Sequence, residues 1–222
     1  MERMAGRKTF IAIAGNIGSG KSSLTRWLAD RLGYGACFEV VDDNPYLDDF
    51  YRDMKTWSFH TQVYFLSRRF ENHRRITEGD RSVVQDRSIY EDSVIFARNL
   101  HDQGMMSDRD YDNYQDLYRT MANFFQPPDL LLYLKCSVPT LMRRIAKRGR
   151  SYEQEIPRDY IAQLNDLYDE WVEGFDGAPK LVLPGDDLDF VSSWMDFSFI
   201  LDMIDAMKVD PDRLQASLFA QR

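Results

Sequence analysis

The 222-residue chain has little of several features that define whole classes of protein. Its two cysteines, Cys37 and Cys136, stand far apart without metal-ligand spacing, which favours free thiols in a reducing cytosol over a disulfide framework. His60, His73 and His101 form no cluster, so we expect no metal held by histidine. No apolar run approaches the ~20 residues of a membrane span, and a strand-like run begins so early that we expect no signal peptide.

An excess of basic charge is also missing. The chain has 28 Lys and Arg against 36 Asp and Glu, a formal net charge of −8. This balance disfavours duplex nucleic acid or an anionic membrane as the main partner. With 44% hydrophobic residues, no low-complexity tract and no internal repeat, the composition is that of a globular protein. The length suits a single domain over residues 1–222.

Short apolar runs alternate with longer stretches of helical periodicity. The strand candidates are 9–14, 36–41, 82–86, 129–135 and 180–184, and the helix candidates are 21–33, 57–79, 88–103, 107–125, 138–148, 157–175 and 189–208. The strand runs are almost continuously apolar, as expected of strands buried on both faces. The alternation predicts an α/β fold, a five-stranded parallel sheet flanked by helices. We expect the polar tail after about residue 208 to be flexible.

The first strand candidate leads into a glycine-rich segment, "GNIGSGKSS". It matches the Walker A pattern Gly15-x-x-x-x-Gly20-Lys21-Ser22. Glycines allow the backbone to wrap around an anion, and the following helix contributes the positive end of its dipole. Lys21 is expected to reach the β- and γ-phosphates, and the Ser22 hydroxyl to bind Mg²⁺. The predicted nucleoside triphosphate site consists of Gly15, Asn16, Ile17, Gly18, Ser19, Gly20, Lys21, Ser22 and Ser23.

A strongly acidic stretch follows the second strand candidate. It contains Glu39, Asp42, Asp43, Asp48, Asp49 and Asp53, with Arg52 as its one basic residue. In an open α/β sheet this region borders the substrate crevice, where such charge repels an acceptor that carries its own phosphate. A neutral alcohol instead benefits from a carboxylate that accepts its proton, and Glu39 is the candidate general base. We interpret the other acids as a solvated surface loop.

Two segments carry residues that suit the reading of a nucleobase. Gln62 and Arg69 lie almost two helical turns apart on one face, which fits a base-binding pair and equally fits an aromatic core helix with incidental polar residues. Asp92 and Phe96 project together from the next helix candidate. Asp92 also suits a second role, as an acid that complements the helix dipole. Spacing alone leaves these alternatives open.

Further residues suit a role at phosphate or metal. Asp86 ends the third strand candidate, where it fits an outer contact to Mg²⁺, and Arg87 beside it can steady a phosphoryl group. A basic cluster around Gly149 comprises Arg143, Arg144, Lys147, Arg148 and Arg150. Such cations also satisfy a helix C-terminus, but in a phosphate-transfer protein they suit a lid that closes over the triphosphate.

Taken in order, "GNIGSGKSS", "EVVDDNPYL", "WSFHTQVYFLSRRF", "QDRSIYED" and "RIAKRGRSYEQ" resemble the deoxynucleoside kinases. The likeness runs from about residue 8 to about 208 and is closest to the bacterial deoxyadenosine/deoxycytidine kinases. It implies a P-loop kinase fold with an arginine-rich lid at about 144–157, and a cytoplasmic homodimer packed through helices. It also implies transfer of phosphate from ATP, with Mg²⁺, to the 5′-hydroxyl of deoxyadenosine or deoxycytidine in nucleotide salvage.

The resemblance also implies roles for single residues. Glu39 would deprotonate the 5′-hydroxyl, with Arg87 holding Glu39 and the transferring phosphate. Tyr51 and Glu153 would bind the 3′-hydroxyl of the sugar. The residues implied for the base are Gln62, Arg69, Asp92 and Phe96, and the implied lid arginines are Arg144, Arg148 and Arg150.

Two consequences follow from that resemblance. Animal members carry glutamate where Asp86 stands, so the shorter Asp86 is expected to contact Mg²⁺ through water. The Arg69–Asp92 pair is expected to disfavour thymine, because the ring N–H of thymine is a donor facing the donors of arginine.

Three alternative functions stay open at this point. The first is a deoxyguanosine kinase of the same family. The second is a nucleoside monophosphate kinase, which also has a phosphate loop and an arginine lid. The third is a nucleotide-dependent regulatory protein without turnover, although the guanine-reading Asn-Lys-x-Asp segment of a GTPase is absent. Only a nucleoside kinase needs a proton acceptor at Glu39.

Overall fold

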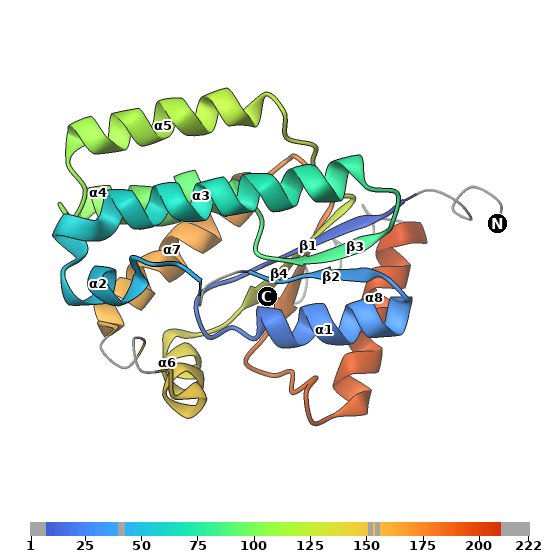
Figure 1. Ribbon diagram of the computed structural model, residues 1–222. Helices are drawn as coiled ribbons and strands as arrows, with labels where there is room; N and C mark the ends of the chain where they lie inside the picture. The colour runs from blue at the N-terminus through green and yellow to red at the C-terminus, as the bar shows by residue number, and fades with distance from the viewer. Residues whose placement is uncertain (1–7, 40–42, 151–152, 154–155, 210–222) are drawn as a thin grey trace.

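A computed structural model describes residues 8–39, 43–150, 153 and 156–209 (Figure 1). Its centre is a five-stranded sheet in the order β2-β3-β1-β4-β5, with every neighbouring pair parallel. The strands are β1 (Phe10–Ala14), β2 (Gly35–Cys37), β3 (Val83–Asp86), β4 (Leu130–Lys135) and β5 (Lys180–Pro184). The predicted α/β fold with a five-stranded parallel sheet is confirmed.

Helices cover both faces of this sheet (Figure 1). They are α1 (Lys21–Leu32), α2 (Leu47–Arg52), α3 (Met54–Glu78), the π-helix η1 (Asp92–Ala97), α4 (Arg98–Asp102), α5 (Asp108–Ala122), α6 (Val138–Arg148), α7 (Arg158–Gly174) and α8 (Trp194–Val209). In the described part of the chain, no helix has the length and apolar character that crossing a membrane requires.

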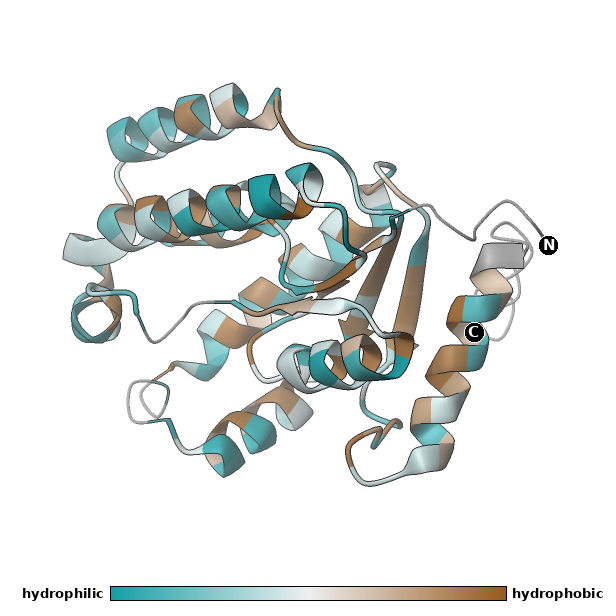
Figure 2. Ribbon diagram, turned by 45° about the vertical axis from the view of Figure 1, so that its right-hand side comes forward, coloured by the Kyte–Doolittle hydropathy of each residue, from teal (hydrophilic) through white to brown (hydrophobic). Residues whose placement is uncertain are grey.

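The alternation of side chains along β1 divides the core into two layers. Ile11 and Ile13 pack with the apolar faces of α1 and α8, whereas Phe10, Ala12 and Ala14 pack with those of α3 and α7. Figure 2 shows the strands as the hydrophobic centre of the molecule, with hydrophilic residues on the outer helix faces. Because β2, β3 and β1 are parallel neighbours, the residues that follow each of them gather at one edge of the sheet.

The acidic stretch is more ordered than predicted. Residues 47–52 form helix α2, because Leu47 and Phe50 lie one turn apart and are buried at 5% and 3% exposure, while Asp48 faces solvent. The interpretation as a surface loop is therefore wrong for 47–52. Strand β2 ends at Cys37, earlier than the predicted residue 41, and Asp42 lies outside the described residues.

Two predicted helices begin later than expected. The last one starts at Trp194 instead of 189, because a turn occupies 190–192 and the Ser193 hydroxyl accepts a hydrogen bond from the Asp196 N–H at the helix start. The predicted helix 88–103 opens with a turn and continues through the π-helical segment η1. Of the predicted lid, residues 151, 152, 154 and 155 lie outside the described residues, as do 210–222 of the predicted flexible tail.

A buried histidine in α3 makes the stability of the fold depend on pH. His73 is 1% exposed, and its Nε2 accepts a hydrogen bond of 3.0 Å from the backbone N–H of Gln126. Burial lowers the pKa of His73 from 6.5 to about 4. The unfolded chain therefore binds this proton at a higher pH than the folded chain does. The stabilising contribution is complete above about pH 6.5 and is lost as the pH falls towards 4.

We expect the free energy of unfolding to fall by roughly 2 kcal/mol through this group between pH 7.5 and pH 5. Urea unfolding of the parent and of His73→Gln at both pH values measures this change in the free energy of unfolding. The variant is expected to be less stable overall and to have a flatter dependence on pH. Equal losses in the two proteins would assign the acid sensitivity to other groups.

Candidate active site

The glycine-rich segment forms the loop between β1 and α1. Gly18 has a left-handed φ of +84°, and a Cβ there would lie 2.9 Å from Ile145 Cγ1 and 3.0 Å from the Leu141 carbonyl oxygen. Gly20, with φ of +104°, is the N-cap of α1. Asn16 braces the loop from behind, because its Nδ2 donates to the Ile161 carbonyl at 2.9 Å. The loop thus has the backbone form that a phosphate group requires.

Lys21 lies inside this loop. Its Nζ donates to the Asn16 carbonyl at 3.0 Å, which holds the side chain curled over the loop backbone. Burial, together with the nearby Arg87, lowers the pKa of Lys21 to about 8. A cation held this way is less tightly solvated than a surface lysine and is positioned to contact a bound anion.

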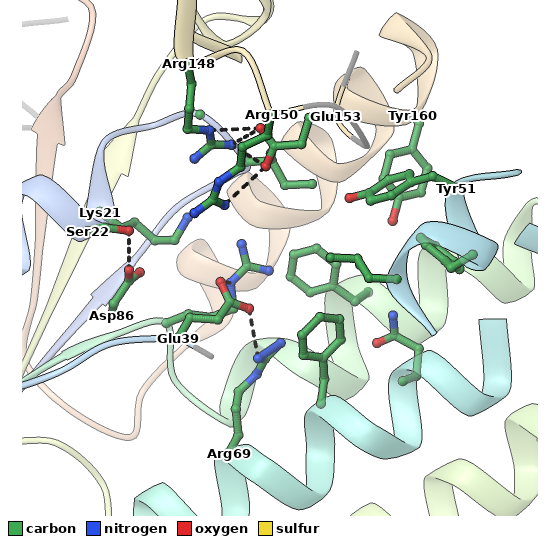
Figure 3. Close-up of a pocket in the computed structure, with 18 residues that line it drawn as sticks. Lys21, Ser22, Glu39, Tyr51, Arg69, Asp86, Arg148, Arg150, Glu153 and Tyr160 are labelled. Carbon is green, nitrogen blue, oxygen red and sulfur yellow. Dashed lines mark hydrogen bonds and ion pairs between the residues drawn. The ribbon is translucent and has the colours of Figure 1, made fainter. Parts of the chain in front are cut away.

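A hydroxyl and a carboxylate meet next to Lys21. The Ser22 Oγ donates to Asp86 Oδ2 at 2.5 Å, which joins the start of α1 to the end of β3 (Figure 3). The other oxygen of Asp86 is buried with no hydrogen-bond partner among the described residues. Burial raises the pKa of Asp86, and the charge of Lys21 partly offsets that effect. Hard oxygen donors with one unused carboxylate oxygen fit Mg²⁺, so the residues present suit this ion.

Glu39 is held between two arginines at the same edge of the sheet. Its Oε1 accepts from Arg69 Nη1 at 2.9 Å, and its Oε2 lies 3.2 Å from Arg87 Nε as an ion pair (Figure 3). Burial alone would raise the pKa of this carboxyl, but Arg87, Arg69 and Lys21 outweigh it and lower the pKa below the ordinary value. Glu39 is therefore ionised at neutral pH and can accept a proton.

Arg69 also forms a second ion pair, with Asp92. Arg69 Nε donates to Asp92 Oδ1 at 2.6 Å, so this arginine bridges Asp92 and Glu39. Burial raises the pKa of Asp92 to about 6, although Arg69 acts in the opposite direction. Gln62 Oε1 and Asp92 Oδ2 are buried and lack hydrogen-bond partners within the described residues. Gln62 faces a cavity, so its oxygen is available to polar groups of a ligand or to water, whereas Asp92 is fully buried behind Arg69.

The arginines after α6 reach Glu153. Arg148 donates from Nε and Nη2 to the two oxygens of Glu153 at 2.9 and 2.6 Å, and Arg150 Nη1 lies 3.5 Å from it (Figure 3). Glu153 is 4% exposed. This ion pair joins a residue predicted to bind the donor phosphates to one predicted to bind the sugar. Arg144 instead braces the phosphate loop by donating to the carbonyls of Ser19 and Gly185 at 2.9 and 2.8 Å.

Most of the predicted site residues line one cavity. They are Ile17, Gly18, Lys21, Ser22, Glu39, Tyr51, Gln62, Arg69, Asp86, Arg87, Phe96, Arg148, Arg150 and Glu153. Asp92 stands behind Arg69, and Gly15, Asn16 and Ser19 shape the loop from outside this cavity. Prediction missed Leu47, Phe50, Phe65 and Tyr160, which line it too. Leu47 and Phe50 could have been predicted, because two apolar residues one helical turn apart within the acidic stretch indicate a buried helix face.

A second hollow opens on the other side of the phosphate loop. It is lined by Gly20, Ser22 and Ser23, by Arg144 and Lys147 of α6, and by the segment 188–192 that follows β5. Sequence reasoning assigned Arg144 to this region but gave no role to 188–192. That segment contains Phe190 and Val191, apolar residues placed beside the loop only by the topology of the sheet.

A phosphate-binding loop that opens onto a partly buried carboxylate, Glu39, at the edge of this parallel sheet places the molecule among the P-loop kinases. The chain belongs to the deoxynucleoside kinase family, whose sequence profile matches residues 11–208. The protein is accordingly an enzyme of the phosphotransferase class, and the predicted family is confirmed.

Individual relatives agree with this placement. The deoxyadenosine/deoxycytidine kinase of Bacillus subtilis is 42% identical over 200 residues, which cover 89% of this chain and 92% of that protein. A deoxyguanosine kinase of Lactobacillus acidophilus is 42% identical over 205 residues, covering 88% of this chain and 89% of that protein. The structure of M. mycoides deoxyadenosine kinase, with dCMP and a flexible dCDP bound, has a TM-score of 0.80 at 30% identity. It covers 89% of this chain and 100% of its own.

Proposed function

We propose that this enzyme transfers the γ-phosphoryl group of ATP to the 5′-hydroxyl of a deoxynucleoside, deoxyadenosine first and deoxycytidine second. The observation that carries the proposal is the ionised Glu39 in one cavity with Lys21 and Ser22. An alcohol acceptor must lose a proton as it attacks, whereas a monophosphate acceptor has no proton to lose at its nucleophilic oxygen. An ionised carboxylate beside a phosphate loop is therefore suited to an alcohol acceptor.

In the proposed reaction the 5′-oxygen attacks the γ-phosphorus, and the bond from that phosphorus to the β,γ-bridging oxygen breaks. Glu39 takes the hydroxyl proton, and ADP leaves. Arg87 and Lys21 stabilise the charge on the transferring group. Ser22, and Asp86 through water, would hold Mg²⁺, which when bound neutralises charge on the β- and γ-phosphates.

We assign the remaining cavity residues to the acceptor. Gln62 and the Arg69–Asp92 pair would hydrogen-bond the base, and Phe96 would stack on it. Tyr51 and Glu153 would bind the 3′-hydroxyl once Arg148 turns from Glu153 to the donor phosphates. The second hollow, between α6 and residues 188–192, would take the nucleoside part of ATP, with Arg144, Arg148 and Arg150 along its rim.

Phosphate transfer from ATP with Mg²⁺ to the four deoxynucleosides and their four monophosphates tests the proposal. Transfer to deoxyadenosine with inert monophosphates is the expected result. Activity on monophosphates alone would overturn the role of Glu39. Preference for deoxyguanosine would instead indicate a deoxyguanosine kinase, an alternative supported by the 42% identity to the deoxyguanosine kinase of Lactobacillus acidophilus.

Substitution of Gly18 by alanine is expected to weaken ATP binding about tenfold or more, because strained backbone and a displaced loop each cost on the order of a kcal/mol or more. The new Cβ would collide with Ile145 and with the Leu141 carbonyl, so the loop must move. Calorimetric titration with ATP measures the loss. Gly174→Ala is the matched control, because a Cβ there meets nothing within 4 Å. Equal affinities for ATP in the parent and in Gly18→Ala would exclude a phosphate at this part of the loop.

We further propose that the chain acts as one domain over 1–222 and as a cytoplasmic homodimer packed through α3 and α5. Phe124, just after α5, is 69% exposed beside Phe70 of α3, and such apolar surface favours packing against a second copy. Light scattering distinguishes the monomer mass of 26.1 kDa from twice that value.

The proposed cytoplasmic location is supported by the two cysteines, Cys37 and Cys136, which are free thiols and suit a reducing compartment.

A further inference from the structure

The backbone of Arg87 is strained. It is the one residue other than glycine with a left-handed φ, +62°, in the part of the chain that the structure describes. A non-glycine residue in this region costs roughly 1–3 kcal/mol, and the conformation persists only where surrounding contacts enforce it. The Arg87 N–H donates to the Ile13 carbonyl at 3.0 Å, which fixes the peptide on the N-terminal side of the residue.

This backbone conformation sets the position of the guanidinium. Arg87 leaves the edge of the sheet directly after Asp86, and its side chain lies with Cζ 4.3 Å from the centroid of the Phe96 ring and Nε 3.2 Å from Glu39 Oε2. The Arg87 side chain thus reaches one carboxylate oxygen of the proposed general base, and Arg69 reaches the other. An extended backbone at residue 87 would direct the same side chain elsewhere.

A buried carboxylate holds the peptide on the C-terminal side. Glu91 Oε1 accepts from the backbone N–H of Ser88 at 2.7 Å and from the Ser88 hydroxyl at 3.0 Å. The Ser88 N–H belongs to the peptide plane that follows Arg87, so this contact restrains the ψ angle of Arg87. Ser88-x-x-Glu91 is the spacing of a capping box, in which the side chain of the fourth residue accepts from the backbone N–H of the first, the N-cap residue.

Glu91 is itself fixed from the opposite side. Its Oε2 accepts from the Tyr168 hydroxyl of α7 at 2.7 Å, and Glu91 is 0% exposed. All three contacts are donated to the carboxylate and, with the charge of Arg87, act to lower its pKa, but burial outweighs them and raises the pKa of Glu91 above the ordinary value. Glu91 does not line the cavity, and the sequence pattern gave it no role. Its contacts nevertheless connect α7 to the one strained residue of the site.

We propose that Glu91 is a positioning residue for phosphoryl transfer: by holding Ser88 it fixes the left-handed backbone of Arg87, and with it the place of the guanidinium beside Glu39. The inference rests on the proposed function, because it acts through the role assigned to Arg87. This positioning role depends on the side-chain length and the acceptor oxygen of residue 91 more than on its charge.

Two variants separate reach from charge. Glu91→Gln keeps the length and one acceptor oxygen, and glutamine also serves at this position of a capping box. Glu91→Asp keeps the charge but is one methylene too short to reach Ser88. We expect Glu91→Asp to lower kcat about tenfold or more while KM for ATP and deoxynucleoside stay near parental values, and Glu91→Gln to recover most of the rate. Glu170→Ala, an exposed acid of α7 paired with Arg98, is the control and keeps the parental kcat.

A double-mutant cycle with Arg87→Ala completes the test. If Glu91 acts through Arg87, adding Glu91→Asp to Arg87→Ala lowers kcat no further. Additive losses would show a structural role independent of Arg87 and overturn the proposal, as would a larger loss in Glu91→Gln than in Glu91→Asp. Impaired Arg87→Ala with fully active Glu91→Asp overturns this inference alone. Parental kcat in Arg87→Ala overturns both this inference and the catalytic role of Arg87, which distinguishes the two failures. Thermal melting of each variant verifies that it is folded.

Discussion

Replacement of Glu39 by glutamine is expected to lower kcat by roughly 10²–10⁴ while ATP affinity barely changes, because general base catalysis contributes about that much. Glutamine has nearly the same shape but cannot take the hydroxyl proton. Arg69 and Arg87 hold the pKa of Glu39 below its ordinary value, so in the parent the base is ready at neutral pH. Steady-state kinetics at saturating substrates gives kcat, and calorimetric titration gives the affinity for ATP.

Asp48→Asn is the matched control for this substitution, because Asp48 lies in the same acidic stretch but faces solvent on α2. It is expected to keep the parental kcat. A Glu39→Gln enzyme as fast as the parent would remove Glu39 from the mechanism. Loss of ATP binding in that variant would instead indicate a role in holding the donor.

Substitution of both Arg69 and Asp92 by alanine is expected to shift base choice towards thymidine. In the proposed site the pair would present arginine donors to the base, and the ring N–H of thymine is also a donor, so removing the pair would relieve that conflict. We expect the ratio of kcat/KM for thymidine to that for deoxyadenosine to rise about tenfold or more, since a well-formed polar contact to a base edge discriminates by roughly 1–3 kcal/mol.

The ratio is the informative quantity because Arg69 also binds Glu39 at 2.9 Å. Loss of the contact to Glu39 is expected to lower the rate for every deoxynucleoside alike. Only loss of the contacts to the base changes the preference among deoxynucleosides. Arg75→Ala, an exposed arginine of the same helix, is the control for helix α3. Unchanged ratios in the double variant would show that other residues of the cavity select the base.

The sequence predicts those parts of the site that neighbouring residues along the chain determine. The loop from Gly15 to Ser23 follows from glycines, a lysine and a serine at fixed spacing after an apolar strand, and Glu39 follows from its place after the second strand. Parallel strand order then brings these segments to one edge of the sheet, where the structure has them together.

Contacts between distant segments could not be predicted in this way. Segment 188–192 carries no phosphate-binding pattern and reaches the second hollow only because β5 pairs with β4. Arg144 was expected in a lid, but its contacts are backbone carbonyls of Ser19 and Gly185, which composition does not reveal. Helix α2 was not predicted, because its acidic residues indicated a solvated loop. The helix forms because two of its residues, Leu47 and Phe50, are apolar and buried.

The bridging position of Arg69 has a consequence for how new specificities can arise in this enzyme. One guanidinium is paired with both Asp92 and Glu39, so under the proposed roles it would serve base recognition and the support of the proton acceptor together. A substitution at residue 69 that admits a different base removes a partner of Glu39 at the same step. A change of base specificity through residue 69 is therefore expected to pass through an intermediate variant with a lower kcat, unless a second substitution places a new cation beside Glu39. Gln62 lines the same cavity and has no hydrogen bond to Glu39 in the described structure, so changes at Gln62 are expected to alter base choice while leaving turnover intact.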